Sequence, residues 1–210
     1  MSSDERLCGC EVLARGEALQ DEARFNEAAL ELFAAQFARN RPYGDYCRRL
    51  GRTPAEVRHW TAEAEAGRFE IQREVGYVAG IATYILAGEL ALGRVLAGDL
   101  PRPAFPDRLR ETAPAAWSRL AAGALQFAVV HAGRGDRVAC LANLTQATLA
   151  TAQARMAAAG EWVLNEKRLV ARAGLDHIQT RLAGPGHDLA ALVASVGGLL
   201  DLHDSVWPGD

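Results

Sequence analysis

The sequence has almost no lysine, few aromatic side chains and no long uninterrupted apolar run. Lys167 is the only lysine among 23 basic residues, and aromatic residues make up 7% of the 210 positions. The longest apolar stretch, 75–92, is interrupted by three glycines and Glu89, whereas a membrane-spanning helix needs about 20 apolar residues in succession. We therefore expect no membrane partner.

Cysteine and histidine are too scattered to predict a metal site. Of the four cysteines, Cys8 and Cys10 are separated by one residue and have no second pair, and the five histidines are dispersed. A structural zinc site usually needs a wider Cys spacing and two further ligands. The N-terminus also lacks the basic and then apolar pattern of an export signal, which favours a cytoplasmic, reducing location without disulfides.

The balance of charge argues against DNA as a partner. The net charge is −3, whereas nonspecific binding of nucleic acid needs a dense basic surface. A small anionic ligand held by two or three local bases stays compatible with this balance. Half of the residues are hydrophobic, which is enough for a core, and abundant Ala and Leu favour helix. Together with the preference for Arg over Lys, this composition is typical of a GC-rich bacterial coding sequence.

Hydrophobic periodicity predicts a mainly α protein built from short-looped helices. Thr53, Pro54 and Glu56 form a helix start with a capping box, and Pro114 is expected to break one long helix. Short loops favour antiparallel neighbours, so the larger part of the chain should be a helical bundle. The expected helices are 19–40, 43–50, 53–66, 81–97, 107–132, 136–159, 165–173, 175–183 and 188–202.

One segment departs from the helical pattern. Residues 68–78 interleave β-forming and charged side chains, which predicts one short strand there. This segment also follows the natural boundary at Gly67. We therefore divide the chain into an N-terminal helical segment, 1–66, and a helical bundle, 67–205.

Several stretches resemble a known family. Residues 74–84 and 87–96, the helix opening at Gly135-Asp136 and the run Leu164 to Lys167 resemble the helical half of aminoglycoside-type nucleotidyltransferases of actinobacteria. The resemblance covers about residues 62–200. Ahead of it, the segment from Phe25 to Trp60 loosely resembles the start of acyl-protein synthetase-like adenylating enzymes, of which only an edge would be present.

The resemblance implies a nucleotidyltransferase-family protein without its catalytic core. Complete members use magnesium and a nucleoside triphosphate, held by paired carboxylates that follow a Gly-Ser pair. That marker is absent, and the Asp201/Asp204 pair has no Gly-Ser before it. We expect a truncated protein that retains the substrate-binding half, binds no cofactor and is inactive alone. Its partner would be a catalytic domain in trans, or a second copy in a homodimer.

The same resemblance supplies candidate site residues. Glu89 resembles the base that activates the acceptor hydroxyl, and its place in an apolar helix predicts that it is buried. The expected substrate-binding residues are Tyr84, Arg94, Asn165, Glu166 and Lys167. Tyr77 and Tyr84 lie beside the expected cleft, where either could stack on a base.

Each candidate also has a structural alternative. Glu89 could pair with Arg94, Asn165 could cap a helix, and both tyrosines could pack in the core. The whole chain could instead be a helical protein–protein interaction module without ligand chemistry. Glu89 and Lys167 facing one pocket would favour the transferase hypothesis, whereas an exposed apolar patch would favour the module.

A ribonuclease is the weakest hypothesis. Two pairs, Arg172 with His177 and Arg181 with His187, match a ribonuclease spacing found in some small helical domains. Each pair spans a glycine, so its two side chains need not share a helical face. Among so many arginines such matches arise by chance, and the chain has no Gly-x-x-x-x-Gly-Lys motif for phosphates.

Overall fold

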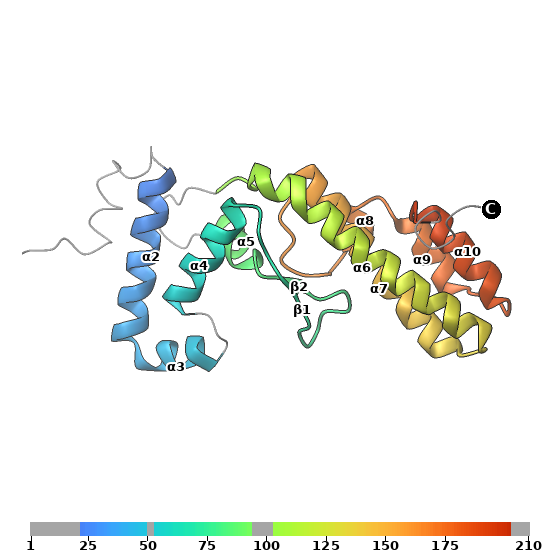
Figure 1. Cartoon of the computed structure of the whole chain (residues 1–210). Helices are drawn as coiled ribbons and strands as arrows, with labels where there is room; N and C mark the ends of the chain where they lie inside the picture. Colours follow the sequence, from blue (N-terminus) through green and yellow to red (C-terminus); the bar gives the residue numbers. More distant parts are fainter. Residues whose placement is uncertain (1–21, 50–52, 94–102, 203–210) are drawn as a thin grey trace, which may run out of the picture.

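The computed structural model describes residues 22–49, 53–93 and 103–202, and these are mainly helical (Figure 1). Each described helix falls short of the length or apolarity that a bilayer crossing demands. The elements are α2 (Glu22–Arg39), α3 (Arg41–Arg49), α4 (Pro54–Glu65), β1 (Ile71–Gln72), β2 (Ile81–Ala82), α5 (Ile85–Leu92), α6 (Asp107–Gly133), α7 (Arg137–Ala159), α8 (Leu169–Arg172), α9 (Asp176–Ala183) and α10 (Leu189–Leu199).

The long antiparallel pair α6/α7 forms the centre of the helical bundle (Figure 1). Its buried stripe on α6 runs through Leu109, Ala113 and Trp117 to Ala128, and small alanines of α7 let the two helices approach closely. The expected break at Pro114 is wrong, because α6 is continuous there. Proline removes one helical hydrogen bond, but the fully buried Ala113 and Trp117 on either side hold the helix in place.

The start of α4 is the one predicted from local chemistry. The Thr53 side chain accepts a hydrogen bond from the Glu56 backbone, and the Glu56 carboxylate accepts one from the Thr53 backbone at 2.9 Å. The far end of α4 docks on α6, where the Thr112 hydroxyl donates to the Gly67 carbonyl at 2.7 Å. Helix α4 therefore connects α2 and α3 to the rest of the chain. The expected division of the chain into 1–66 and 67–205 stays a prediction.

The strand expected within 68–78 is present, but its partner occupies residues expected to be helical. Strand β1 pairs antiparallel with β2, with Ile71 opposite Ala82 and Gln72 opposite Ile81. The helix expected over 81–97 is therefore wrong at its start, because α5 begins only at Ile85. Gly80 explains the turn: its φ is +100°, and a Cβ there would lie 2.7 Å from the Gln72 carbonyl oxygen.

The C-terminal helices are shorter than expected. Helix α8 begins at Leu169 instead of residue 165, and α10 ends at Leu199 instead of residue 202. Asp188 caps α10, because its side chain accepts from the Ala191 backbone at 2.9 Å. Helix α10 packs against both α6 and α7, so it covers one side of the central pair.

Candidate functional site

The loop between β1 and β2, residues 73–80, is held by a distant segment of the chain. The Glu166 carboxylate accepts hydrogen bonds from the backbone nitrogens of Val78 and Ala79, each at 2.8 Å. Next to this, the Tyr77 hydroxyl donates to the Leu164 carbonyl at 2.9 Å. Bonds to a carboxylate are stronger than neutral ones, so Glu166 fixes the loop against the segment before α8.

The Asn-Glu-Lys run is a turn that presents Glu166. The Asn165 side chain accepts from the Lys167 backbone at 3.0 Å, which closes an Asx turn. Asn165 is therefore not the cap of a helix beginning at residue 165. Lys167 is exposed, and Arg168 adopts a left-handed φ of 56° before α8 begins.

Tyr84 is a core residue in this structure. Its side chain is 3% exposed, and its hydroxyl accepts a hydrogen bond from the Trp117 indole at 2.9 Å. The ring contacts Phe69, Phe105 and Trp162. Burial raises the pKa of Tyr84 to about 12, so the phenol stays neutral. Of the alternatives weighed for this residue, packing in the core is the one observed.

Glu89 does not have the burial expected of it. The residue is exposed on α5, although most of its helical neighbours are buried. The reason is that α5 covers only Ile85–Leu92 and lies at the edge of the core, which leaves one side facing outward. Arg94, the expected substrate-binding residue on the same segment, lies outside the described residues.

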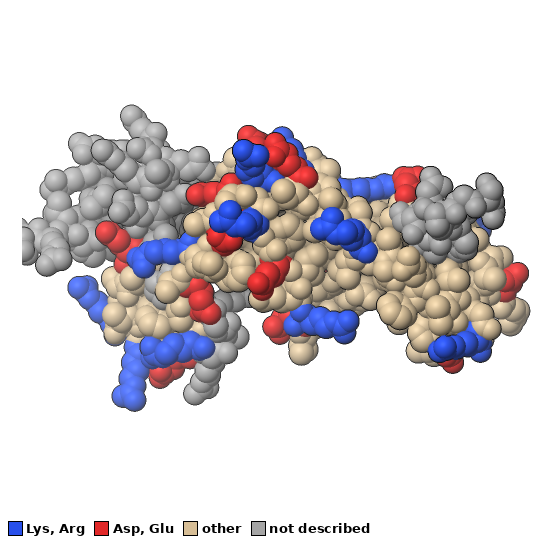
Figure 2. Space-filling model, in the orientation of Figure 1, with Lys and Arg blue, Asp and Glu red and all other residues tan. Residues whose placement is uncertain are grey.

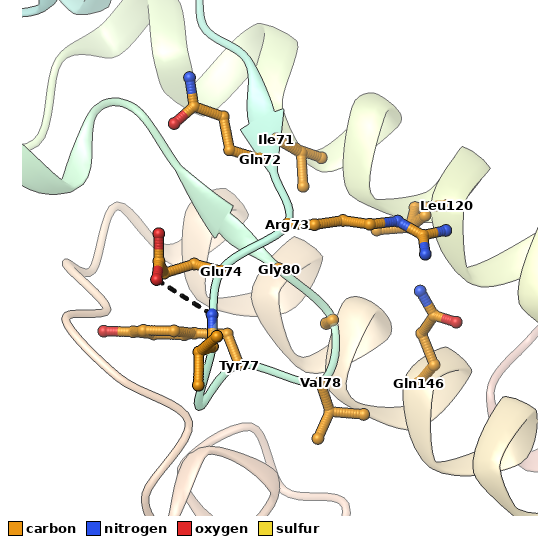
Figure 3. A pocket seen from close by; sticks show the side chains of 11 residues that line it. Ile71, Gln72, Arg73, Glu74, Tyr77, Val78, Gly80, Leu120 and Gln146 are labelled. Carbon is orange, nitrogen blue, oxygen red and sulfur yellow. Dashed lines mark hydrogen bonds between the residues drawn. The ribbon is translucent and has the colours of Figure 1, made fainter. Parts of the chain in front are cut away.

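A pocket of about 480 Å³ lies under the loop 73–80. Side chains of the loop form one wall, and Leu120 of α6 and Gln146 of α7 form the other. Figure 3 shows the Arg73 guanidinium extending across the pocket toward both of them. The expected site residues Tyr84, Glu89, Asn165, Glu166 and Lys167 do not line this pocket. Glu166 acts on it only indirectly, through the loop backbone.

The two charged residues of the loop point in opposite directions. Arg73 turns toward α6 and α7, whereas the Glu74 carboxylate lies on the other side of the loop and accepts from the Val75 backbone at 3.0 Å (Figure 3). Among the described residues, no hydrogen bond or ion pair is made by the side chains of Arg73 and Gln146. The pocket therefore contains an exposed cation and a partly exposed amide that no described side chain engages.

Arg73 is not among the site residues expected from the sequence. A local signal for it exists in the sequence after β1, where the charged pair Arg73 and Glu74 comes shortly before the turn residue Gly76. The contribution of α6 and α7 has no local signal, because Leu120 and Gln146 are distant from the loop in sequence. A pocket of this kind is visible only once the chain is folded.

Of the residues in the ribonuclease-like spacings, Arg172 has a structural role. Arg172 donates to the Trp162 carbonyl at 3.1 Å and to Glu161 at 3.3 Å, so it anchors the segment after α7. Within the described part of the chain, no three His, Cys, Asp or Glu side chains gather to hold a metal ion. Asp201 lies near Arg155, at 3.7 Å, and Asp204 lies outside the described residues.

Comparison with protein-family models, curated proteins and solved structures yields no match for this chain. The resemblance to the helical half of nucleotidyltransferases therefore stays a prediction, carried only by the short motifs quoted above.

Proposed function

We propose that this chain is a helical interaction module that pairs with a second copy of itself through one face of the α6/α7 hairpin. The observation that carries the proposal is an exposed apolar surface at the end of the hairpin near the α6–α7 connection. Phe127 is 62% exposed and Val138 is 84% exposed there. Large apolar side chains grouped on a surface are typical of protein–protein interfaces.

The two helices contribute almost no charge to this surface. Residues 120–133 of α6 and 138–154 of α7 contain no Asp, Glu, Lys or Arg, and the charges between them are confined to the connection. Figure 2 shows the second half of α6 as a largely uncharged region, whereas charged side chains lie over the first half of the helix. Charge depletion distinguishes the centre of an interface from ordinary protein surface.

Uncharged side chains recur at helical spacing along both helices. On α6, Leu120, Phe127 and Val130 follow one another at helical spacing. On α7, Val138, Ala142 and Gln146 recur every four residues. Leu120 and Gln146 both line the pocket under the loop, so these two residues lie on the same side of the hairpin. We call the exposed residues nearer the connection, Phe127, Val130, Val138 and Ala142, the open face.

A second copy is the occupant that fits an uncharged two-helix layer. Two helical hairpins packed face to face form a four-helix bundle, one of the common arrangements of helices. A two-fold pair buries the same patch on both copies, so the absence of charge on one side is matched by its absence on the other. A strongly charged partner would have to desolvate its charges against this face without forming ion pairs.

The test is the association state of the full chain in a concentration series by sedimentation velocity. We expect dimers for the natural sequence and monomers for Phe127→Glu and Val138→Glu. Ala115→Glu is the matched control, because Ala115 is an exposed residue of the same helix. It lies about 18 Å from Phe127 along the axis and about 120° around it. The proposal would be overturned if the natural chain stayed monomeric over the whole concentration series. It would also be overturned if Ala115→Glu dissociated as completely as Phe127→Glu and Val138→Glu.

The nucleotidyltransferase hypothesis makes a different prediction. Its expected residues do not meet at the pocket, since Tyr84 is in the core and Glu89 and Lys167 are exposed elsewhere. We expect no tight binding of magnesium with a nucleoside triphosphate, measured by calorimetry. Measurable turnover of the triphosphate would favour the transferase. A cytoplasmic location and the absence of a DNA partner remain predictions from composition.

A further inference from the structure

We propose that Arg73 and Gln146 form a binding site for a small monocarboxylate with an apolar tail. This inference goes beyond the proposed self-association and does not depend on it. The pocket of about 480 Å³ lies within the range of about 300–1,000 Å³ usual for small-molecule sites. Apolar side chains line part of it, and its polar lining residues are Gln72, Arg73, Glu74, Tyr77 and Gln146.

Arg73 and Gln146 both present hydrogen-bond donors to the same part of the pocket. In Figure 3 the Gln146 side-chain nitrogen is turned toward the Arg73 guanidinium, so two sets of donors face each other. Neither side chain has a hydrogen-bond partner among the described residues. A carboxylate placed between them would accept from both, and Arg presents its donors in a fork that matches the two carboxylate oxygens.

The single positive charge of Arg73 favours a ligand with one carboxylate over a phosphate. Phosphate sites commonly use a series of free backbone nitrogens in a loop. In the loop 73–80 those of Val75, Tyr77, Val78 and Ala79 already donate to Glu74 or Glu166. Arg73 is therefore left as a single positive charge, which one carboxylate neutralises. Glu74 also lines the pocket, but its carboxylate lies on the far side of the loop from Arg73 and accepts from the Val75 backbone.

The remaining walls suit an apolar tail. Ile71, Val78 and Leu120 line the pocket around the guanidinium, and Val78 is half exposed at its mouth. A ligand that covered these side chains would remove apolar surface from water while its carboxylate stayed at the polar end. Because Glu166 fixes the loop backbone, the position of Arg73 relative to α6 and α7 is set before the ligand arrives.

The experiment is a titration of the full chain with 3-phenylpropionate, followed by NMR of the Arg side-chain Nε–H and Gln side-chain amide signals. It is run at a concentration where sedimentation gives one species, so a failure of self-association does not affect the readout. We expect saturable shifts at Arg73 and Gln146. The neutral 3-phenylpropionamide and inorganic phosphate, used as comparison probes, should bind at least about tenfold more weakly.

Three variants make the assignment specific. Arg73→Gln should weaken binding of 3-phenylpropionate about tenfold or more, because one charge-assisted contact is worth about that factor. Gln146→Glu should abolish binding, because its own carboxylate would lie beside Arg73 and repel the carboxylate of the ligand. Arg119→Gln is the control, because it removes the same charge next to Leu120 without lining the pocket. Equal loss in the control, equal binding of the amide, preferential binding of phosphate, or shifts confined to other residues would overturn the proposal.

Discussion

Large apolar side chains of α6 are buried near its start and exposed near the α6–α7 connection, where α10 packs only against another side of the hairpin. Trp117 has no exposed surface and donates to Tyr84, whereas Phe127, ten residues later on the same helix, is largely exposed. The difference does not come from α6 itself, since both ends carry alanine and large apolar side chains. It comes from segments elsewhere in the chain: the β1/β2 hairpin and residues 162–169 cover the first end. An exposed apolar row is therefore a surface that the described residues of the chain do not cover, which is the basis of the proposed pairing.

The sharpest way to test this contrast is to remove one large side chain at each end. Trp117→Ala should lower the free energy of unfolding by about 3–5 kcal/mol, because it empties a fully buried site and leaves the Tyr84 hydroxyl without its donor. Phe127→Ala should change the stability of the monomer by only about 0.5 kcal/mol or less. Urea denaturation of both variants measures this, and equal losses would contradict the difference in burial between the two ends.

The buried phenol of Tyr84 should lower the free energy of unfolding at alkaline pH. Burial raises the pKa of Tyr84 from 10.0 to about 12, so the folded chain keeps a proton that the unfolded chain releases. Stability is complete below pH 10, falls as pH rises between 10 and 12 and levels off above this window. Two pKa units correspond to about 2.7 kcal/mol. Unfolding free energies of the natural chain and Tyr84→Phe, compared across the window, measure the effect; an unchanged slope in the variant would contradict it.

The loop that carries Arg73 should respond to glycine replacement according to how close its neighbours lie. Gly80 and Gly76 both have positive φ, +100° and +92°, but only Gly80 lies against the Gln72 carbonyl. Gly76→Ala should cost about 1 kcal/mol from backbone strain alone. Gly80→Ala should cost about 2 kcal/mol, because the strand pair must also shift. Thermal unfolding measures both, and equal losses would show that the β1/β2 contact contributes little.

The features predictable from the sequence are those determined by neighbours along the chain. The capping box of Thr53 and Glu56 lies within four residues, and the periodicity of α6 and α7 extends over many turns. Both were predicted, as was the mainly helical bundle. The break at Pro114 was not observed, because burial of the surrounding turns outweighs the local preference of proline.

The features that could not be predicted depend on distant pairs. Strand β2 exists because Ile81 pairs with Gln72, and apolar periodicity alone cannot distinguish such a strand from the start of a helix. Glu166 was singled out only through the family resemblance, whereas its partners Val78 and Ala79 lie 88 and 87 residues away. The exposure of Glu89 likewise follows from how far α5 extends, which its composition does not reveal.

We call the two hydrogen bonds from Val78 and Ala79 to the Glu166 carboxylate the loop clamp. Its loss should have the smallest effect on stability, and a nearby surface carboxylate serves as the comparison. Glu166→Gln should cost only about 1 kcal/mol, because an amide oxygen can keep one of the two backbone bonds and the Val78 side of the clamp is open to water. Its local signature should be larger: faster hydrogen exchange at Val78 and Ala79, with little change at α6. Glu161→Gln is the matched control, since this exposed carboxylate contacts only Arg172 at 3.3 Å, and such surface pairs contribute little. If exchange at the loop were unchanged in Glu166→Gln, the clamp would not be what positions Arg73. The carboxylate site would then have to form by movement of the loop on binding, with weaker affinity as the consequence.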